Sequence, residues 1–327
     1  MLFGNPRRFA GLVLLCFCAS VNNTVKNIVV LPKLCHFSLS SKERYDFVLA
    51  YWASIPAQFA MLYSFLTGCA WGLTGHRWDI VEKNNFAKKF ARARFIRLIS
   101  ASGVRLLGSK YSERFAEKIE VVHLGVDTAA MGDVEASLAS TRMVCIANLS
   151  PVKGLEHLID AMKDVTADVS LDLIGDGPLR QALSERVVAA GLQERVKLLG
   201  ALPHSEVTSR LLSGAYGGLV LPSVDLGGGL HEGIPVVLME AMASGVPVIS
   251  TRTGGIPELL GENSEFGICV EEKSPGQLAK AINDLLTSRS LRESYAARGR
   301  ERVLEKFDNR KNTRALYEMM AKAAAAG

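Results

Sequence analysis

The sequence predicts an α/β protein with two domains, each built around a mostly parallel β-sheet. The chain has 327 residues, which is enough for two domains of ordinary size. Its composition, 48% hydrophobic and 22% charged, is that of a globular protein with a sizeable core. In the second half, short apolar runs alternate with segments of helical periodicity, a pattern typical of βαβ units.

The first half has a less regular pattern, which we interpret as the later part of an α/β domain. Residues 47–75 contain no Asp, Glu, Lys or Arg and are numerous enough to span a bilayer. Because Pro56 and Gly68 interrupt the stretch, we favour a buried strand, helix and strand of a parallel sheet. In chain order, the expected elements are a strand at 47–50, a helix at 56–66, a strand at 71–74, a helix at 85–94, and strands at 95–100 and 119–123.

The second half gives a clearer series of elements. We expect strands at 143–147, 171–174, 196–199, 219–221, 248–250 and 267–270, and helices at 155–165, 179–190, 205–212, 236–243 and 275–286. Right-handed crossovers between such strands give a doubly wound sheet with a ligand crevice at the carboxyl ends of the strands. The expected domains are residues 1–135, residues 136–310, and a C-terminal helix at 311–327 that packs back on the first domain.

Charge is distributed unevenly along the chain. Residues 1–141 carry 17 Lys and Arg against 10 Asp and Glu, a balance of +7, whereas the rest of the chain balances to −2. This asymmetry indicates either contact with an anionic membrane surface or phosphorylated lipid, or ordinary solvated helix faces. We do not expect nucleic acid as a partner.

The start of the chain and the cysteines bear on localisation. Arg7 and Arg8 followed by the apolar residues 9–21 are also typical of a short signal peptide, and with residues 47–75 they leave a membrane-anchored protein as an alternative. The six cysteines lie mostly in apolar runs, without the spacing of metal ligands, as expected in a reducing compartment. We therefore expect a cytoplasmic protein, soluble or peripheral on the inner face of the plasma membrane, with no metal site.

Residues 227–240 carry the most informative chemistry. Glu232 lies in a glycine-rich loop, and Glu240 lies in the helix that Pro235 is suited to begin. The amides of Val236 and Val237 at that helix start are suited to bind a diphosphate. A carboxylate accepts hydrogen bonds from the paired hydroxyls of a ribose or a hexose. The alternative interpretation is a helix with two solvent-facing glutamates.

The second half resembles the family 4 retaining glycosyltransferases of the GT-B fold. The matching segments, in the family's order, are residues 149–155, 174–179, 200–203, 221–223, 232–240, 241–248 and 253–258. The resemblance implies two Rossmann-like domains, of which the first is incomplete because its opening βα unit is missing. It also implies transfer of a hexose from a UDP- or GDP-sugar to a lipid-linked or polysaccharide acceptor, with retention and without a metal or other cofactor.

The resemblance assigns roles to individual residues. Glu240 would hold the ribose of the nucleotide, Glu232 the hydroxyls of the donor sugar, and Lys153 the β-phosphate. Backbone around the donor would come from Gly233, Ile234, Pro235, Val236 and Val237, and from Gly254 and Gly255, with residues 200–203 beside the base.

The first half resembles the family's acceptor domain more loosely, through residues 74–86. There the resemblance places His76 next to the donor sugar at the reaction centre. The basic helix around Lys88 and Arg92 either touches anionic lipid head groups or is a solvated face.

Two departures from the family leave an alternative function open. Ala147 and Asn148 stand where the family has Gly-Arg, so Asn148 lines the phosphate site without a second positive charge. Together with the missing first unit, this makes a catalytically inactive remnant that retains nucleotide binding the alternative to an active transferase.

Overall fold

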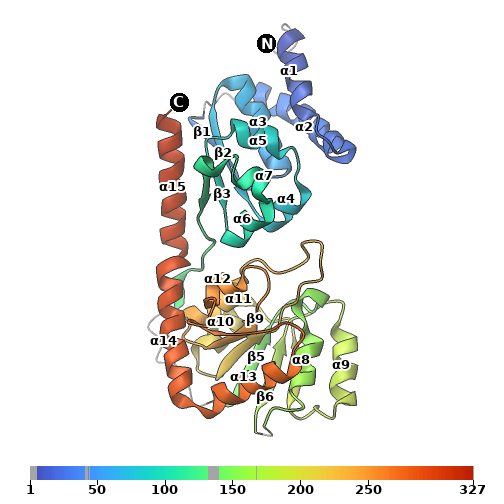
Figure 1. The fold of residues 1–327 in the computed structure, drawn as a ribbon, viewed down its shortest axis with the longest axis vertical. Coiled ribbons are helices and arrows are strands. Elements are labelled where there is room, and N and C mark those ends of the chain that lie inside the picture. The colour runs from blue at the N-terminus through green and yellow to red at the C-terminus, as the bar shows by residue number, and fades with distance from the viewer. Residues whose placement is uncertain (1–5, 41–42, 44, 132–139, 167, 327) are drawn as a thin grey trace. The chain divides into compact units, whose positions relative to one another are not determined.

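A computed structural model describes residues 6–40, 43, 45–131, 140–166 and 168–326 of the chain (Figure 1). The chain forms two compact units, Met1–His123 with Asn312–Gly327, and Leu124–Lys311. The predicted fold class, α/β with two parallel-sheet Rossmann-like domains, is confirmed.

The division between the units falls earlier in the chain than the sequence indicated. The expected boundary at 135/136 lies outside the described residues, and residues 124–131 already belong to the second unit. Val126 explains this assignment, because its N–H donates to the carbonyl of Phe307 and its carbonyl accepts from the N–H of Asn309. The final residues, from Asn312 onward, group with the first unit, where Met319 lines a hollow together with Phe95.

The first unit contains a sheet of four parallel strands in the order β1-β2-β3-β4. The strands are β1 (Phe47–Ala50), β2 (Ala70–Gly75), β3 (Ile96–Leu98) and β4 (Ile119–Val121). Its helices are α1 (Pro6–Cys16), α2 (Val21–Ser40), α3 (Ile55–Thr67), α4 (Arg77–Glu82), α5 (Phe86–Arg92), α6 (Ala101–Leu107), α7 (Ser109–Ser112) and the 3-10 turn η1 (Ala116–Lys118). Residues 47–75 thus form a strand, a helix and a strand, as favoured from the sequence.

Local sequence explains where several of these helices begin and end. Pro56 lies in the first turn of α3, and Gly68, with φ +78°, ends the helix by donating its N–H to the carbonyl of Ser64. The helix expected at 85–94 is α5, which begins one residue later and ends two residues earlier. Asn85, in the left-handed conformation, separates α4 from α5, and Ala93 returns to an extended conformation.

Residues 6–40 form the hairpin of α1 and α2, a segment in which we predicted no helix or strand of the domain. Buried residues of both helices belong to the hydrophobic core of the first unit, and α1 and α2 both pack on α3. Among the helices formed by the described residues, none combines the length and the apolar character needed to cross a membrane.

The second unit contains a sheet of six parallel strands in the order β10-β9-β8-β5-β6-β7. The strands are β5 (Arg142–Ile146), β6 (Ser170–Ile174), β7 (Val196–Gly200), β8 (Gly218–Leu221), β9 (Val248–Thr251) and β10 (Ile268–Val270). The chain runs outward from β5 to β7, returns to β8 beside β5, and runs outward again to β10. The reversal between β5 and β8 is therefore the topological switch point of the sheet.

Helices connect the strands of the second unit on both faces of the sheet. They are α8 (Leu155–Ala161), α9 (Arg180–Ala189), α10 (His204–Leu212), α11 (Val236–Ala243), α12 (Ile256–Leu260), α13 (Pro275–Thr287), α14 (Arg289–Lys306) and the 3-10 turns η2 (Thr128–Met131) and η3 (Pro151–Lys153). α15 (Asn309–Ala325) follows. Helix α8 packs against α9 and α13, whereas α11 packs against α14, as right-handed crossovers on either side of the switch point require.

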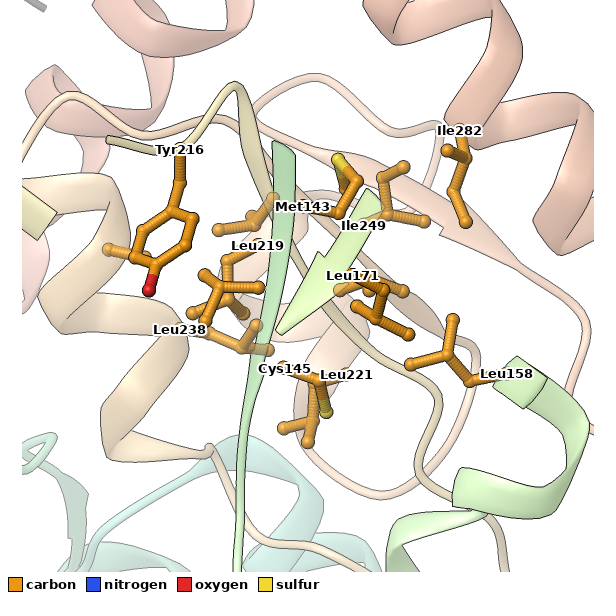
Figure 2. Close-up of a cluster of buried hydrophobic side chains, with 14 of the residues drawn as sticks. Met143, Cys145, Leu158, Leu171, Tyr216, Leu219, Leu221, Leu238, Ile249 and Ile282 are labelled. Atoms are coloured by element: carbon orange, nitrogen blue, oxygen red, sulfur yellow. The ribbon is translucent and has the colours of Figure 1, made fainter. Parts of the chain in front are cut away.

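The core of the second unit lies between these helices and the central strands. Figure 2 shows side chains of β5, β6, β8 and β9 meeting those of α8, α11 and α13. Met143, Leu171, Leu219 and Ile249 are fully buried, since central parallel strands are covered on both faces. This rigid core fixes the ends of β5 and β8, where the candidate site lies.

A glycine at the switch point provides a test of the fold. Gly154 follows η3 with φ +58°, and a Cβ there would overlap the carbonyl oxygen of Pro222 in the loop after β8. We expect Gly154→Ala to lower the free energy of unfolding by about 2–4 kcal/mol, from left-handed strain plus overpacking.

Gly191 is the matched control, because its φ is +68° but no atom lies within 4 Å of its ideal Cβ position. Gly191→Ala should therefore cost only the left-handed strain, about 1 kcal/mol. Urea denaturation of both variants measures the difference, and equal losses would contradict a close approach at Gly154.

Candidate functional site

The carboxyl ends of β5 and β8 bring two loops together at the switch point of the second unit. The loop after β5 contains Asn148 and ends at Lys153, and the loop after β8 leads to Glu232. The N–H of Val224 donates to the carbonyl of Val152 at 2.9 Å, which joins the two loops. In a doubly wound sheet, the loops that diverge at the switch point usually form the ligand crevice.

The loop after β5 presents Lys153 to Glu232. Nζ of Lys153 lies 2.6 Å from Oε1 of Glu232, and the side chains are 17% and 16% exposed. An ion pair of two half-buried groups is shielded from salt, and its remaining surface is open to a ligand. These two predicted site residues are therefore in direct contact.

The start of α11 follows Glu232 closely in the chain, and the described residues provide no hydrogen-bond partner for its first two amides. Pro235 is the N-cap, with φ −66° and ψ 125°, and no side chain caps the helix. Val236 and Val237 are its first two residues, and the N–H of Leu238 bonds back to the carbonyl of Pro235 at 3.2 Å. Free amides and the helix dipole make such an end suited to an anion.

The loop after β9 closes on the segment that carries Glu232. Gly254 has φ +58°, and a Cβ there would overlap the carbonyl oxygen of Glu232. The N–H of Gly255 donates to the carbonyl of Gly233 at 3.0 Å, and a Cβ on Gly255 would lie 2.8 Å from Cγ1 of Ile234. Glycine at these positions is thus required by the approach of two backbones.

Glu240 makes a contact that the sequence analysis missed. Its Oε1 lies 2.9 Å from Nε2 of His204, the first residue of α10. Glu240 is 16% exposed and His204 is 73% exposed, so the imidazole covers the carboxylate from the solvent side. The resemblance places residues 200–203 beside the base, and His204 is the residue that directly follows them.

A cavity of about 870 Å³ lies beside Glu240. Val236, Glu240 and His204 line one part of it, and residues 125–127 line another. A volume of this size accommodates a nucleotide-sized ligand. After β8 and β9, two buried hydroxyls, Oγ of Ser223 and Oγ1 of Thr253, have no hydrogen-bond partner among the described residues.

Asn148 occupies the end of β5 and is exposed. Its carbonyl accepts the N–H of Ser150 at 2.8 Å, and its side-chain oxygen lies 2.4 Å from the position of an ideal Cβ on Gly177. The amide side chain therefore stands at the strand end but adds no charge to the pair of Lys153 and Glu232.

His76 lies in the first unit, at the carboxyl end of β2. It is 8% exposed, and Trp52 stacks on its imidazole with the ring centroids 4.1 Å apart. Tyr51 lies on the same imidazole at 5.4 Å. The loop after β1 thus puts two aromatic rings, themselves about half exposed, in contact with His76.

Two buried charges hold that loop in place. The carboxylate of Asp79 accepts the N–H of Ala53, Ser54 and His76 at 3.1–3.2 Å. Nζ of Lys89 donates to the carbonyls of Ala53 and Ser54 at 2.9 and 2.6 Å. The peptide groups after β1 are therefore bound on both their N–H and their C=O sides.

Burial affects the pKa values of both charges. Burial alone would raise the pKa of Asp79, but the hydrogen bonds from His76, Ser54 and Ala53 outweigh it and hold the pKa below its usual value. Burial lowers the pKa of Lys89 to about 7, although Glu82 and Asp79 oppose the shift. Lys89 therefore loses its charge at a pH where surface lysines keep theirs.

The contacts of the two lysines of α5 bear on its interpretation as a basic surface. Lys89 is fully buried, and Nζ of Lys88 donates to the carbonyls of Leu14 and Phe17 at 2.7 and 2.6 Å. Of the basic positions on this helix, Arg92 is exposed. Lys88 and Lys89 therefore both donate to carbonyl groups within the first unit, and neither interpretation of the helix as a whole is decided by these contacts.

Comparison with known proteins identifies the family. The fold defines a protein with two parallel-sheet Rossmann-like domains, and the pair of Lys153 and Glu232 lies at the switch point of the second. The model of the family described as "Glycosyl transferases group 1" matches residues 133–302. The chain therefore belongs to the group 1 glycosyltransferase family.

Curated relatives support the same family. The glycosyltransferase MJ1178 of Methanocaldococcus jannaschii is 30% identical over 237 residues, covering 70% of this chain and 62% of that protein. A GDP-mannose-dependent phosphatidylinositol monomannoside mannosyltransferase of Mycobacterium tuberculosis is 29% identical, covering 60% and 54%. The amylovoran biosynthesis glycosyltransferase AmsK of Erwinia amylovora is 35% identical, covering 45% and 37%. The matches thus span less than two thirds of the length of these relatives.

Solved structures share the fold. HepE of Anabaena in complex with UDP superposes with a TM-score of 0.75 at 18% identity, covering 90% of this chain and 82% of that one. Sucrose-phosphate synthase of Thermosynechococcus elongatus superposes with a TM-score of 0.70 at 20% identity, covering 91% and 80%. At this identity the likeness establishes the two-domain GT-B fold.

The buried lysine makes the stability of the first unit depend on pH. Because the pKa of Lys89 is lower in the folded chain than in the unfolded chain, the unfolded chain binds more protons between the two values. The cost of burying the charge is present in full below pH 7 and disappears as the pH rises toward 10.5. Neutral Lys89 still donates its hydrogen bonds.

We expect the stability lost in Lys89→Met to be larger at pH 9 than at pH 6, by about 1–3 kcal/mol. Urea denaturation at both pH values measures the two losses, and Lys110→Met, at an exposed position, controls for the loss of a surface lysine. A loss that is the same at both pH values would contradict the lowered pKa of Lys89.

Proposed function

We propose that the chain is a retaining glycosyltransferase that moves a hexose from a nucleoside diphosphate sugar to a lipid-linked or polysaccharide acceptor, without a metal ion. The observation that carries the proposal is the contact of Lys153 with Glu232 at the switch point, shortly before the uncapped start of α11 in the chain. In this proposal, the cation, the hydroxyl-binding carboxylate and the amides at the start of α11 act on the same donor.

The chemistry of the transfer matches these groups. As the bond between the sugar and the diphosphate breaks, negative charge accumulates on the leaving β-phosphate. The ammonium of Lys153 and the amides of Val236 and Val237 are fixed charges and dipoles suited to offset it, which is the role a metal ion has in other transferases. In a retaining transfer, the acceptor attacks the face from which the diphosphate leaves.

Glu232 and Glu240 divide the recognition of the donor in this proposal. Glu232, held by Lys153, accepts hydroxyl hydrogen bonds from the transferred sugar. Glu240 accepts those of the ribose, next to the cavity of about 870 Å³. The ribose then takes the place at the carboxylate that His204 occupies in the free protein.

The relatives support the class of donor and acceptor. The structure of HepE contains UDP, and the mycobacterial relative uses GDP-mannose, so we keep both UDP- and GDP-sugars as donors. AmsK acts in amylovoran biosynthesis, and the mycobacterial relative glycosylates a phosphatidylinositol mannoside. We therefore propose a lipid-linked or polysaccharide acceptor at the inner face of the membrane. The placement of His76 next to the donor sugar stays a prediction.

Nucleotide binding tests the assignment of Glu240. In isothermal titration, UDP or GDP should bind the folded chain more tightly than millimolar. Glu240→Ala should reduce binding of both the diphosphate and the corresponding nucleoside to an undetectable level, because the ribose loses a paired acceptor. Glu194→Ala, which removes an almost fully exposed carboxylate from the same unit, is the control. Absence of binding by UDP, GDP and ADP would overturn the donor-site assignment.

The charge of Lys153 makes a separate prediction. Lys153→Met should weaken the binding of the nucleoside diphosphate by about 10- to 100-fold through loss of a charge-assisted contact. It should leave the affinity for the nucleoside alone unchanged, because the nucleoside has no phosphate. Lys163→Met, at an exposed ion pair with Asp160, should change neither affinity. An equal loss for nucleoside and diphosphate would contradict the phosphate role of Lys153.

A further inference from the structure

The hairpin of α1 and α2 carries an exposed apolar surface that the proposed function does not use. On α2, Val21, Val25 and Val29 are 80%, 55% and 61% exposed, and Ile28 is 38% exposed. Positions 21, 25, 28 and 29 follow the spacing of one helix face. On α1, Leu14 is 66% exposed. We call these five residues the hairpin surface.

The exposure of this face does not reflect poor packing of α2. The opposite face of the helix is buried, with Asn27 and Leu34 at 0% and Val30 at 5% exposed. Nδ2 of Asn27 donates to the carbonyl of Cys16, and α2 packs on α3. The helix is therefore fixed to the unit by one face while it presents a second, apolar face to the outside.

Cations accompany the hairpin surface. Residues 6–40 contain four Lys and Arg residues and no Asp or Glu. Arg7, Arg8 and Lys33 are exposed, and Lys26 is paired with Glu82 at 2.8 Å. Lys26 and Lys33 lie seven residues apart, on one row beside the apolar stripe. The charged residues of this segment are all positive, although Glu82 of α4 pairs with Lys26. An apolar face on such a segment matches the chemistry of a bilayer with anionic head groups.

We propose that the α1–α2 hairpin docks the protein on an anionic lipid surface, with α2 lying in the plane of the interface. Val21, Val25, Ile28 and Val29 then enter the boundary between head groups and acyl chains, and the cations contact the phosphates. This differs from a membrane span, because one full face of α2 belongs to the protein core. It also involves a different element from α5, whose two lysines make internal contacts.

Vesicle binding by the full chain tests this proposal. We expect the protein to cosediment with vesicles of phosphatidylcholine and phosphatidylglycerol, and to bind pure phosphatidylcholine at least about tenfold more weakly. The double variant Val25→Asp and Val29→Asp should lose about tenfold or more of the binding to the mixed vesicles. Val188→Asp, at an exposed apolar position on α9, is the matched control and should bind as the unchanged protein does.

A second variant separates charge from apolar contact. Lys33→Glu reverses one exposed charge without touching the apolar stripe, and should weaken binding to the mixed vesicles by about tenfold while leaving thermal unfolding unchanged. Each variant is also titrated with UDP or GDP, and unchanged nucleotide affinity shows that the donor site is intact. If the unchanged protein binds neither UDP nor GDP, the proposed function is contradicted. The vesicle experiment still decides the docking proposal by itself.

Three outcomes overturn the proposal. The first is no binding to either vesicle, and the second is binding that the two aspartates leave intact. The third is a dimer in light scattering that the two aspartates convert to a monomer, which would show that a second copy of the chain covers the hairpin surface.

Discussion

The close approach of two loops at the switch point determines the geometry of the second unit's site. Gly154 lets the loop after β5 lie against the carbonyl of Pro222, and the N–H of Val224 bonds to Val152. This contact directs the ammonium of Lys153 to Glu232. A side chain at position 154 would separate the loops, and the cation would then lie away from the carboxylate that it neutralises. The remaining groups of the site are arranged around this contact.

The glycines after β9 extend the same principle. Gly254 and Gly255 bring a third loop against the backbone of Glu232 and Gly233. Three loops from β5, β8 and β9 thus fix the backbone around Glu232 through close contacts, and the ammonium of Lys153 contacts its carboxylate. Such a site is preorganised, so a ligand that binds it does not have to order the loops.

The first unit fixes its own polar loop by a different means, with buried charges in place of glycines. Asp79 and Lys89 bind the N–H and C=O groups of the same peptides after β1, and Trp52 is thereby held on His76. Burial costs each charge part of its solvation, as the lowered pKa of Lys89 shows. Hydrogen bonds to the backbone offset that cost and define the conformation of the loop.

The sequence by itself determined the α/β class, the order of the second unit's strands and helices, and the segment that contains Glu232 and Glu240. Alternating apolar runs and helical periods are local signals, and glycine and proline mark where they change. Only the tertiary structure decided that Lys89 is buried, that His204 covers Glu240, and that α1 and α2 form a hairpin with two different faces. These features depend on which elements pack together. A local sequence pattern does not distinguish a solvent-exposed lysine from one that binds carbonyl groups far away in the sequence.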